Sequence, residues 1–231
     1  MNQNVETKKM IATINLLAIA IVLDVLISAI PGLNLSMPFG GKFFGISMLP
    51  IVLIGLMFGL KYGLISGFIY ALYNFGIDYI IYIETLKITL EGWTGESWGA
   101  FRIFLLVLFD YIIPFMAFGL SGLFKDGLSK KYRFVYAFVS ISVIRLISST
   151  ISGVILWSSS IEYASSQVEL GEESANIATR IFSFVGQNIW LYSLGYNFIY
   201  IATTLATALV IGLLIYKRLQ VLNNDYFNFS K

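Results

Sequence analysis

The sequence predicts an all-α membrane protein with six transmembrane helices and both termini in the cytoplasm. Composition is the first indication: 58% of the 231 residues are hydrophobic and only 12% are charged, with a mean hydropathy of +0.81. A soluble domain is roughly 45–50% apolar and about 25% charged. The other two indications are apolar runs of spanning length and basic residues concentrated in alternate connections. We therefore expect a single integral membrane domain over residues 1–231.

Six apolar segments are candidate spans, because a transmembrane helix needs about 20 mostly apolar residues. They lie near residues 9–30, 45–60, 62–83, 100–124, 134–158 and 188–217. The second is short, and Pro50 near its start is placed to tilt or kink it. Glycines recur every four residues across the second and third segments, at Gly55, Gly59, Gly63 and Gly67. This spacing lets helix backbones approach closely in lipid, so ordinary helix packing is the expected role.

The distribution of basic residues predicts the orientation in the membrane. With the N-terminus inside, the cytoplasmic segments hold ten basic residues: Lys8, Lys9, Lys61, Lys125, Lys130, Lys131, Arg133, Lys217, Arg218 and Lys231. The outer connections hold four: Lys42, Lys87, Arg102 and Arg180. Cytoplasmic loops carry the excess of Lys and Arg, so both termini are expected to be cytoplasmic, in agreement with an even number of spans.

Three connections on the predicted outer face are long, at residues 31–44, 84–99 and 159–187. The second contains Trp93 and Trp98, and the third is rich in Ser and Glu. Long loops on one face suit a lid over a site that opens outward. The alternative, solvated segments with no role in binding, stays open for 159–187.

Several functional classes lack support in the sequence. The chain has no Cys and no His, which removes thiol chemistry, disulfides and the usual zinc ligand and general base. No Walker loop, H-E-x-x-H or G-x-S-x-G motif occurs. A net charge of +2 is too small to indicate a nucleic-acid partner. We therefore expect no enzymatic activity, no metal and no cofactor.

Few ionisable residues lie inside the predicted spans: Asp24, Asp78, Asp110 and Arg145. An ionisable group within a span is expensive unless it has a partner or faces a polar cavity, so each is a candidate functional residue. Arg145 lies deeper than the others, where it would be placed to neutralise Asp110 or Asp78. A purely structural ion pair therefore remains an alternative to a binding site.

Polar and aromatic side chains form stripes beside these residues. One stripe contains Arg145, Ser149, Gly153 and Trp157, a second contains Tyr70, Asn74 and Asp78, and the last span begins with Trp190, Tyr192, Tyr196 and Asn197. Together with Asp110 and Tyr111, they lie toward the outer half of the predicted bundle. Aromatic faces combined with a carboxylate suit a small, flat ligand, including a cationic one.

Three segments resemble signature segments of a known family: FDYIIPFMAFGLSGLF (109–124), ISGVILW (151–157) and LYSLGYN (191–197). They are similar to the thiamine-specific substrate-binding subunit (S component) of energy-coupling factor (ECF) vitamin transporters. LPIVLIGLMFGLKYGLISGFIYALY (49–73) resembles the second and third helices of such subunits. The resemblance runs in order from about residue 12 to 218. It implies a multi-pass protein of the bacterial plasma membrane.

The resemblance also implies a set of pocket residues. Asp110 and Tyr111 stand where the family has a carboxylate, usually Glu, followed by Tyr, and Trp157 matches its stacking Trp. Tyr192 and Asn197 match its Tyr and Asn on the last helix. The full predicted ligand-binding set is Asp110, Tyr111, Trp157, Tyr192, Asn197, Ser149, Asn74 and Arg145.

Three features depart from the family pattern. Ser149 replaces a His, the Trp and Glu of the first outer loop fall near Gly41 and Gly45, and the loop before the last helix is longer. Trp93, Trp98 or Tyr163 from the longer loops are candidates to refill the space.

In that family the subunit docks on a scaffold protein and two ATPase subunits, through small residues of its first helix. The nearest equivalents here are Ala18 and Val22. The expected function is therefore high-affinity vitamin binding for an ECF-type importer, with thiamine the first choice of ligand. The alternatives are hydroxymethylpyrimidine, pyridoxine or another B vitamin on the same fold, and a non-transport membrane scaffold in which Asp110 and Arg145 form a structural pair.

Overall fold

The computed structural model describes residues 3–76, 83–95 and 97–224, and most of these residues are helical. The elements are α1 (Gln3–Ala29), α2 (Met48–Phe58), α3 (Leu60–Phe75), α4 (Ile83–Thr94), α5 (Ala100–Leu106), η2 (Val107–Ile112), α6 (Ile113–Gly119), η3 (Leu120–Leu128), α7 (Lys131–Leu156), α8 (Ser158–Glu169), α9 (Ile177–Phe184) and α10 (Ile189–Leu222). The all-α prediction is confirmed for the described part of the chain.

Within the described residues, four helical segments are long and apolar enough to cross a membrane: Val5–Ala29, Ala100–Phe124, Lys131–Leu156 and Ile189–Leu222. They correspond to the predicted spans near 9–30, 100–124, 134–158 and 188–217. The span predicted near 45–60 is the shorter apolar helix α2. The span predicted near 62–83 is represented by α3, which ends at Phe75, and residues 77–82 lie outside the described ranges. A membrane protein is supported, whereas the number of six spans stays a prediction.

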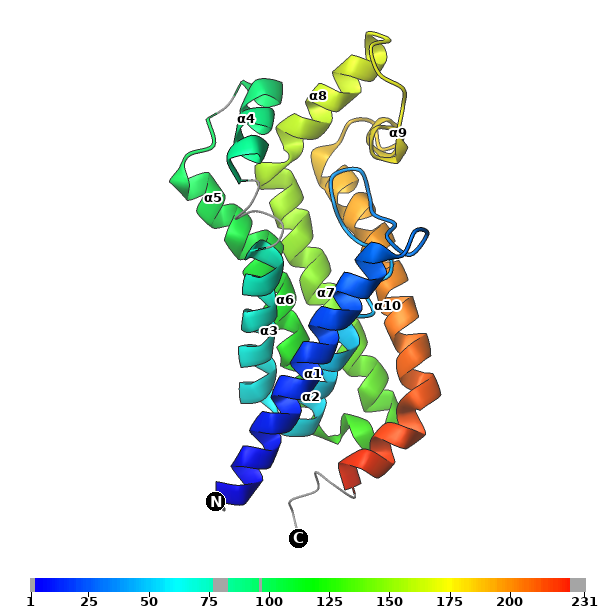
Figure 1. Cartoon of the computed structure of the whole chain (residues 1–231). Helices are drawn as coiled ribbons and strands as arrows, with labels where there is room; N and C mark the ends of the chain where they lie inside the picture. Colours follow the sequence, from blue (N-terminus) through cyan, green and yellow to red (C-terminus); the bar gives the residue numbers. More distant parts are fainter. Residues whose placement is uncertain (1–2, 77–82, 96, 225–231) are drawn as a thin grey trace.

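The helices form an elongated bundle with two distinct ends (Figure 1). α1 begins and α10 ends at the same end, which we call the terminal end. The opposite end carries α4, α8, α9 and the loop of residues 30–47, and we call it the loop end. The membrane side that each end faces stays a prediction.

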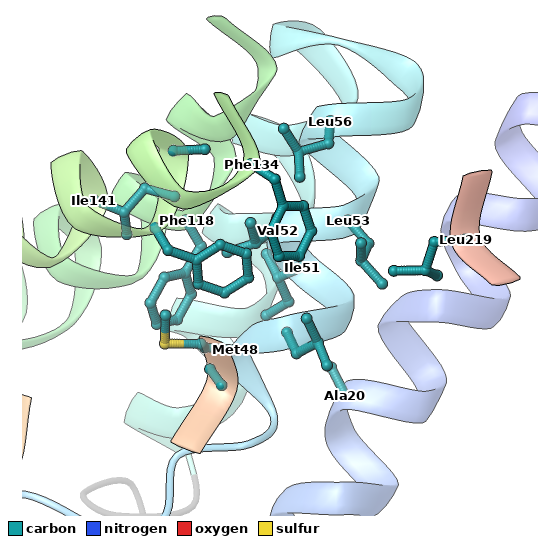
Figure 2. Close-up of a cluster of buried hydrophobic side chains, with 14 of the residues drawn as sticks. Ala20, Met48, Ile51, Val52, Leu53, Leu56, Phe118, Phe134, Ile141 and Leu219 are labelled. Carbon is teal, nitrogen blue, oxygen red and sulfur yellow. The ribbon is translucent and has the colours of Figure 1, made fainter. Parts of the chain in front are cut away.

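The terminal-end half has a closely packed apolar core. Figure 2 shows side chains from α1, α2, α6, α7 and α10 meeting in one cluster, among them Ile51, Phe118 and Phe134, which are all buried. The predicted close approach of glycine-bearing helices occurs here. A methyl group on Gly119 would overlap the backbone of Gly63, and one on Gly67 would come close to the backbone of α6. These glycines therefore let α3 and α6 pack backbone to backbone.

Gly59 has a different role from the other three glycines in its series. It has a φ of +91° and lies between Phe58 and Leu60, at the turn where α2 ends and α3 begins. A side chain is strained in this backbone conformation, whereas glycine adopts it readily. Gly59 therefore forms the turn between two packed helices and is not part of the contact with α6.

The helix that contains Asp110 is interrupted by a wider, π-helical segment. Residues Val107–Ile112 form a π-helical segment, in which the backbone N–H of Ile113 donates to the carbonyl of Leu108, five residues earlier. Pro114 follows directly and has no N–H to donate to the carbonyl of Asp110. Such π segments occur frequently at functional sites. This one carries both Asp110 and Tyr111.

The connections at the loop end contain helices that the sequence did not predict. Residues 84–99 contain most of α4, and residues 159–187 contain α8 and α9. Ile161 of α8 and Phe182 of α9 are buried in one apolar cluster. Asn176 caps α9 by accepting hydrogen bonds from the N–H groups of Ala178 and Thr179. The interpretation of 159–187 as solvated filler is therefore wrong for these packed faces.

Candidate ligand-binding site

A cavity of about 530 Å³ lies within the loop-end half of the bundle. Residues from α1, the 30–47 loop, α2, α3, η2, α6, α7 and α10 form its wall. Its volume falls in the range of about 300–1,000 Å³ that is typical of small-molecule sites. All eight side chains of the predicted binding set line it: Asn74, Asp110, Tyr111, Arg145, Ser149, Trp157, Tyr192 and Asn197. Their contact with a ligand stays a prediction.

Asp110 is joined to Trp157 across the cavity wall. The indole Nε1–H of Trp157 donates to Asp110 Oδ2 over 3.0 Å. Trp157 was expected within a helix over 134–158, but α7 ends at Leu156 and Trp157 occupies the junction with α8.

Arg145 presents a cation to the same cavity without forming the predicted structural pair. Its guanidinium lies over the Phe118 ring, with Cζ 4.8 Å from the ring centroid, and Nη1 is 3.9 Å from Met48 Sδ. Within the described ranges no ion pair joins Arg145 to Asp110, and Asp78 lies outside those ranges. Its buried Nε has no hydrogen-bond partner there. The Asp110–Arg145 pair of the scaffold alternative is therefore wrong.

Asn197 connects α10 to α7 in the wall of the cavity. Its Nδ2 donates to the carbonyl of Ser149 over 3.1 Å and to that of Ser193 over 2.8 Å. Its Oδ1 accepts from the Tyr200 hydroxyl over 2.7 Å. Both the donor and the acceptor of the amide are occupied, so the side chain is held in one orientation. Asn74, on α3, donates to the carbonyl of Tyr70 over 3.0 Å.

An aromatic ladder follows one face of α10. The Tyr192 and Tyr196 ring centroids are 5.6 Å apart, and those of Tyr196 and Tyr200 are 6.4 Å apart. Phe182 of α9 meets the Tyr192 ring edge to face at 5.4 Å. The Tyr192 hydroxyl has no hydrogen-bond partner among the residues described. It is therefore available to a ligand in the cavity.

The 30–47 loop is tied to the bundle beside the cavity. The Tyr196 hydroxyl accepts from the N–H of Phe39 over 2.8 Å and donates to the carbonyl of Gly40 over 3.1 Å. Gly41, where the family has its Trp nearby, lies against the Tyr200 ring so closely that a Cβ would clash. This loop therefore covers part of the site without a tryptophan of its own.

An ion pair adds a second tie between this loop and α1. Lys42 Nζ lies 3.0 Å from Asp24 Oδ1 and donates to Ser28 Oγ over 3.1 Å. The Asp24 side chain is mostly buried, whereas that of Lys42 is 40% exposed. Asp24 was predicted as a candidate functional residue, and the structure gives it a partner that the sequence reasoning did not identify.

Other predicted candidates lie away from the cavity wall. Trp98 is buried against Trp157 but does not line the cavity, and Tyr163 lies on α8 outside the wall. Trp190 is 59% exposed and likewise does not contribute to the wall. The side chain of Trp93 lies outside what the structure describes.

Sequence reasoning missed several residues of the wall, including Tyr200, Phe115 and Lys42. The signal for Tyr200 was present, because Tyr192, Tyr196 and Tyr200 follow one another at intervals of four. Lys42 had no such signal, since its partner Asp24 lies on another element with no regular spacing.

The two predicted docking residues lie on the outside of α1. Ala18 and Val22 are both exposed and are one helical turn apart, whereas Ala20 is buried in the core. The face that carries them is apolar, which suits contact with lipid or with another membrane protein. Docking itself stays a prediction.

Comparison with known proteins finds a matching family and a curated relative. The family described as "Thiamine transporter protein (Thia_YuaJ)" matches residues 93–168, which include Asp110, Tyr111, Ser149 and Trp157. The chain is also 30% identical over 226 residues to the thiamine transporter ThiT of Bacillus subtilis (strain 168). That alignment covers 97% of this chain and 99% of the relative.

Proposed function

This chain belongs to the thiamine transporter family, and we propose that it binds thiamine in the cavity of the loop-end half. It is a transport protein of the bacterial cell membrane and not an enzyme. The observation that carries the proposal is the Asp110–Trp157 pair at the wall of the cavity.

The chemistry of thiamine suits these two side chains. Thiamine joins a positively charged thiazolium ring to an aminopyrimidine, so it offers a cation, two flat rings and an exocyclic amine. Trp157 provides an aromatic face for stacking and for cation–π contact. Asp110 would accept a hydrogen bond from the aminopyrimidine or offset the thiazolium charge. Tyr111 adds a second ring beside the carboxylate.

The remaining wall residues would orient the ligand. The Tyr192 hydroxyl is available as donor or acceptor, and the buried Nε of Arg145 would donate to an acceptor on the ligand. Asn197 and Ser149 hold α10 against α7 and give this wall its shape. Asn74, on α3, would add a polar group to the cavity wall beside Tyr70, whose carbonyl it contacts.

The proposal extends to assembly as an S component. We infer that the chain has six spans with both termini in the cytoplasm and delivers its ligand to an ECF scaffold protein with two ATPase subunits. The resemblance to ECF subunits supports this assembly, as does the exposed apolar face of α1 with Ala18 and Val22. Co-purification of the scaffold with the wild-type chain but not with Ala18→Trp is the expected result.

Ligand-induced quenching of tryptophan fluorescence tests the binding proposal. The chain has four Trp residues, and of the three whose side chains the structure describes, Trp157 lies in the cavity wall. We expect thiamine to quench the purified wild-type protein at submicromolar concentration and to leave Trp157→Ala unquenched. Quenching by pyridoxine or hydroxymethylpyrimidine, but not by thiamine, would retain a vitamin-binding role and replace the ligand.

Asp110→Asn tests the role of the carboxylate within that site. The amide keeps the shape and the acceptor for Trp157 but loses the charge, so thiamine affinity should fall by about 2 kcal/mol or more, roughly 30-fold in Kd. Thermal stability should stay close to wild type, because Asp110 has no ionic partner among the described residues. Unchanged thiamine affinity in Asp110→Asn would refute this assignment.

A further inference from the structure

Trp98 is buried although it lies in a connection at the loop end, between α4 and α5. Only 2% of its surface is exposed. Its ring packs against Trp157, with centroids 5.9 Å apart and planes inclined by 53°. Trp98 does not line the cavity. Trp98 therefore contacts the wall residue Trp157 from outside the cavity.

Trp98 is held in this place by groups on both sides. Its backbone N–H donates to Glu91 Oε1 of α4 over 2.8 Å. The Arg102 guanidinium of α5 lies over its ring, with Cζ 4.5 Å from the centroid. The same guanidinium donates through Nη2 to the carbonyl of Leu156 over 3.2 Å. Arg102 thus contacts both the Trp98 ring and the backbone directly before Trp157.

Trp157 needs such support because no regular helix holds it. It lies where α7 ends and α8 begins, with φ −112° and ψ 0°. On the cavity side its indole is fixed by one hydrogen bond to Asp110. One hydrogen bond at the edge of an indole leaves the ring free to tilt about that bond, and contact with a second aromatic face removes this freedom.

We propose that Trp98 and Arg102 are positioning residues for Trp157, which set the angle of its indole in the cavity wall and thereby raise ligand affinity. The proposal rests on the proposed function for its ligand. It adds α4 and α5 to the elements on which binding depends, although none of their described side chains lines the cavity.

A double-mutant cycle with thiamine tests the Trp98 part. Affinity is measured by titration calorimetry, because the substitutions remove fluorescent residues. Trp98→Ala should raise Kd about 3- to 10-fold, which corresponds to the free energy of an aromatic pair. Trp98→Phe should restore most of the affinity. In the Trp157→Leu background, which has no aromatic ring to position, the Trp98→Ala change should have little further effect, since coupled residues are not additive.

Trp190→Ala is the matched control, because Trp190 is also at the loop end but is exposed and away from the cavity. It should bind thiamine as wild type does. Full additivity of Trp98→Ala and Trp157→Leu would overturn the proposal, and so would wild-type affinity in Trp98→Ala. If Trp98→Ala does not fold, Trp98→Leu and Trp98→Phe are compared in the same cycle, with the same two outcomes.

Circular dichroism tests the Arg102 part without a ligand. Two indoles in close contact produce an exciton couplet in the far ultraviolet, and Trp98→Phe and Trp157→Phe should each abolish it. Arg102→Gln should weaken the couplet, while Arg102→Lys, which keeps the cation over the ring, should retain more of it. A couplet of wild-type amplitude in Arg102→Gln would overturn the positioning role of Arg102. Because no thiamine is needed, this result separates a failure of positioning from a failure of the proposed function.

Discussion

The same helices form a filled apolar core in the terminal-end half of the bundle and a cavity in the loop-end half. α7 contributes Phe134 and Phe138 to the apolar core of the terminal-end half and Ser149 to the cavity of the loop-end half. α10 runs the other way, with Tyr192 in the cavity wall and Ala208 in the core. Large apolar side chains thus fill one half (Figure 2), and polar and aromatic side chains line a cavity in the other.

The two halves also differ in what holds neighbouring elements together. In the terminal-end half, Gly63 and Gly119 bring two helix backbones into direct contact. In the loop-end half, side-chain hydrogen bonds and one ion pair hold the loop and helices around the cavity. We therefore expect substitutions in the first half to change stability and substitutions in the second to change ligand binding.

Of the variants that test this comparison, Gly119→Ala should give the largest effect, and the effect should be a loss of stability. The added methyl group would overlap the backbone of Gly63 and Leu64, and neither backbone can move without separating α3 from α6. Overpacking of this kind costs about 1–3 kcal/mol and occasionally more. We expect a lower thermal unfolding temperature in detergent, measured by circular dichroism, with thiamine affinity retained by the fraction that folds.

Gly92→Ala provides the control for that experiment. Gly92 lies on α4, and a Cβ there would meet no atom within 4 Å. Alanine favours a helix over glycine by up to about 1 kcal/mol, so this variant should be as stable as wild type or more so. If Gly119→Ala melted at the temperature of Gly92→Ala, backbone contact between α3 and α6 would not be what stabilises the terminal-end half.

Asn197→Ala should give the next largest effect, and mainly on binding. It removes the amide that joins α10 to the carbonyl of Ser149, and it leaves the buried Tyr200 hydroxyl without its acceptor. Leaving a buried polar group unpaired costs about 1–3 kcal/mol. Thiamine titration should show a loss of roughly tenfold in Kd. Adding Tyr200→Phe should recover part of it, and no recovery would mean that the amide acts on the ligand directly.

Part of this architecture was predictable because it depends on local pattern. The long apolar runs identified α1, α7 and α10, although the predicted segment 9–30 begins six residues after Gln3 and the predicted segment 188–217 ends five residues before Leu222. The intervals of four along α7 place Arg145 and Ser149 on one face, and polar groups buried in an apolar bundle favour a shared polar cavity.

The rest was not predictable because it depends on contacts between distant segments. The π-helical segment at 107–112 arises in a stretch that reads as an ordinary apolar helix. α8 and α9 form in a Ser- and Glu-rich stretch because Ile161 and Phe182 find partners in the same cluster. The support of Trp157 by Trp98 joins residues that are far apart in the chain, and no spacing rule indicates it.

Tyr196→Phe should give a smaller effect, confined to the loop-end half. It keeps the ring in the aromatic ladder but removes the hydroxyl that holds Phe39 and Gly40 of the 30–47 loop. A net hydrogen bond is worth about 0.5–1.5 kcal/mol. We expect thiamine to dissociate a few times faster in stopped-flow fluorescence, with an unchanged unfolding temperature. Tyr216→Phe, at the terminal end, should show the reverse: Tyr216 donates to Gly127 and Leu128 in the core, so stability should fall and dissociation should not change.

Breaking the Asp24–Lys42 pair should give the smallest effect and the one most sensitive to salt. Because the Lys42 side chain is 40% exposed, the pair is worth at most about 1 kcal/mol, and screening by added salt reduces this further. Lys42→Gln should therefore speed thiamine dissociation about twofold at low ionic strength and hardly at all at high ionic strength. The exchanged pair Asp24→Lys with Lys42→Asp should return the rate toward wild type if attraction between the loop and α1 is the cause. A rate that stayed fast in the exchanged pair would instead assign the effect to the hydrogen bonds with Ser28 and Ser47, which also contact this pair. In either case the result decides whether charge or hydrogen bonding keeps the loop on the cavity.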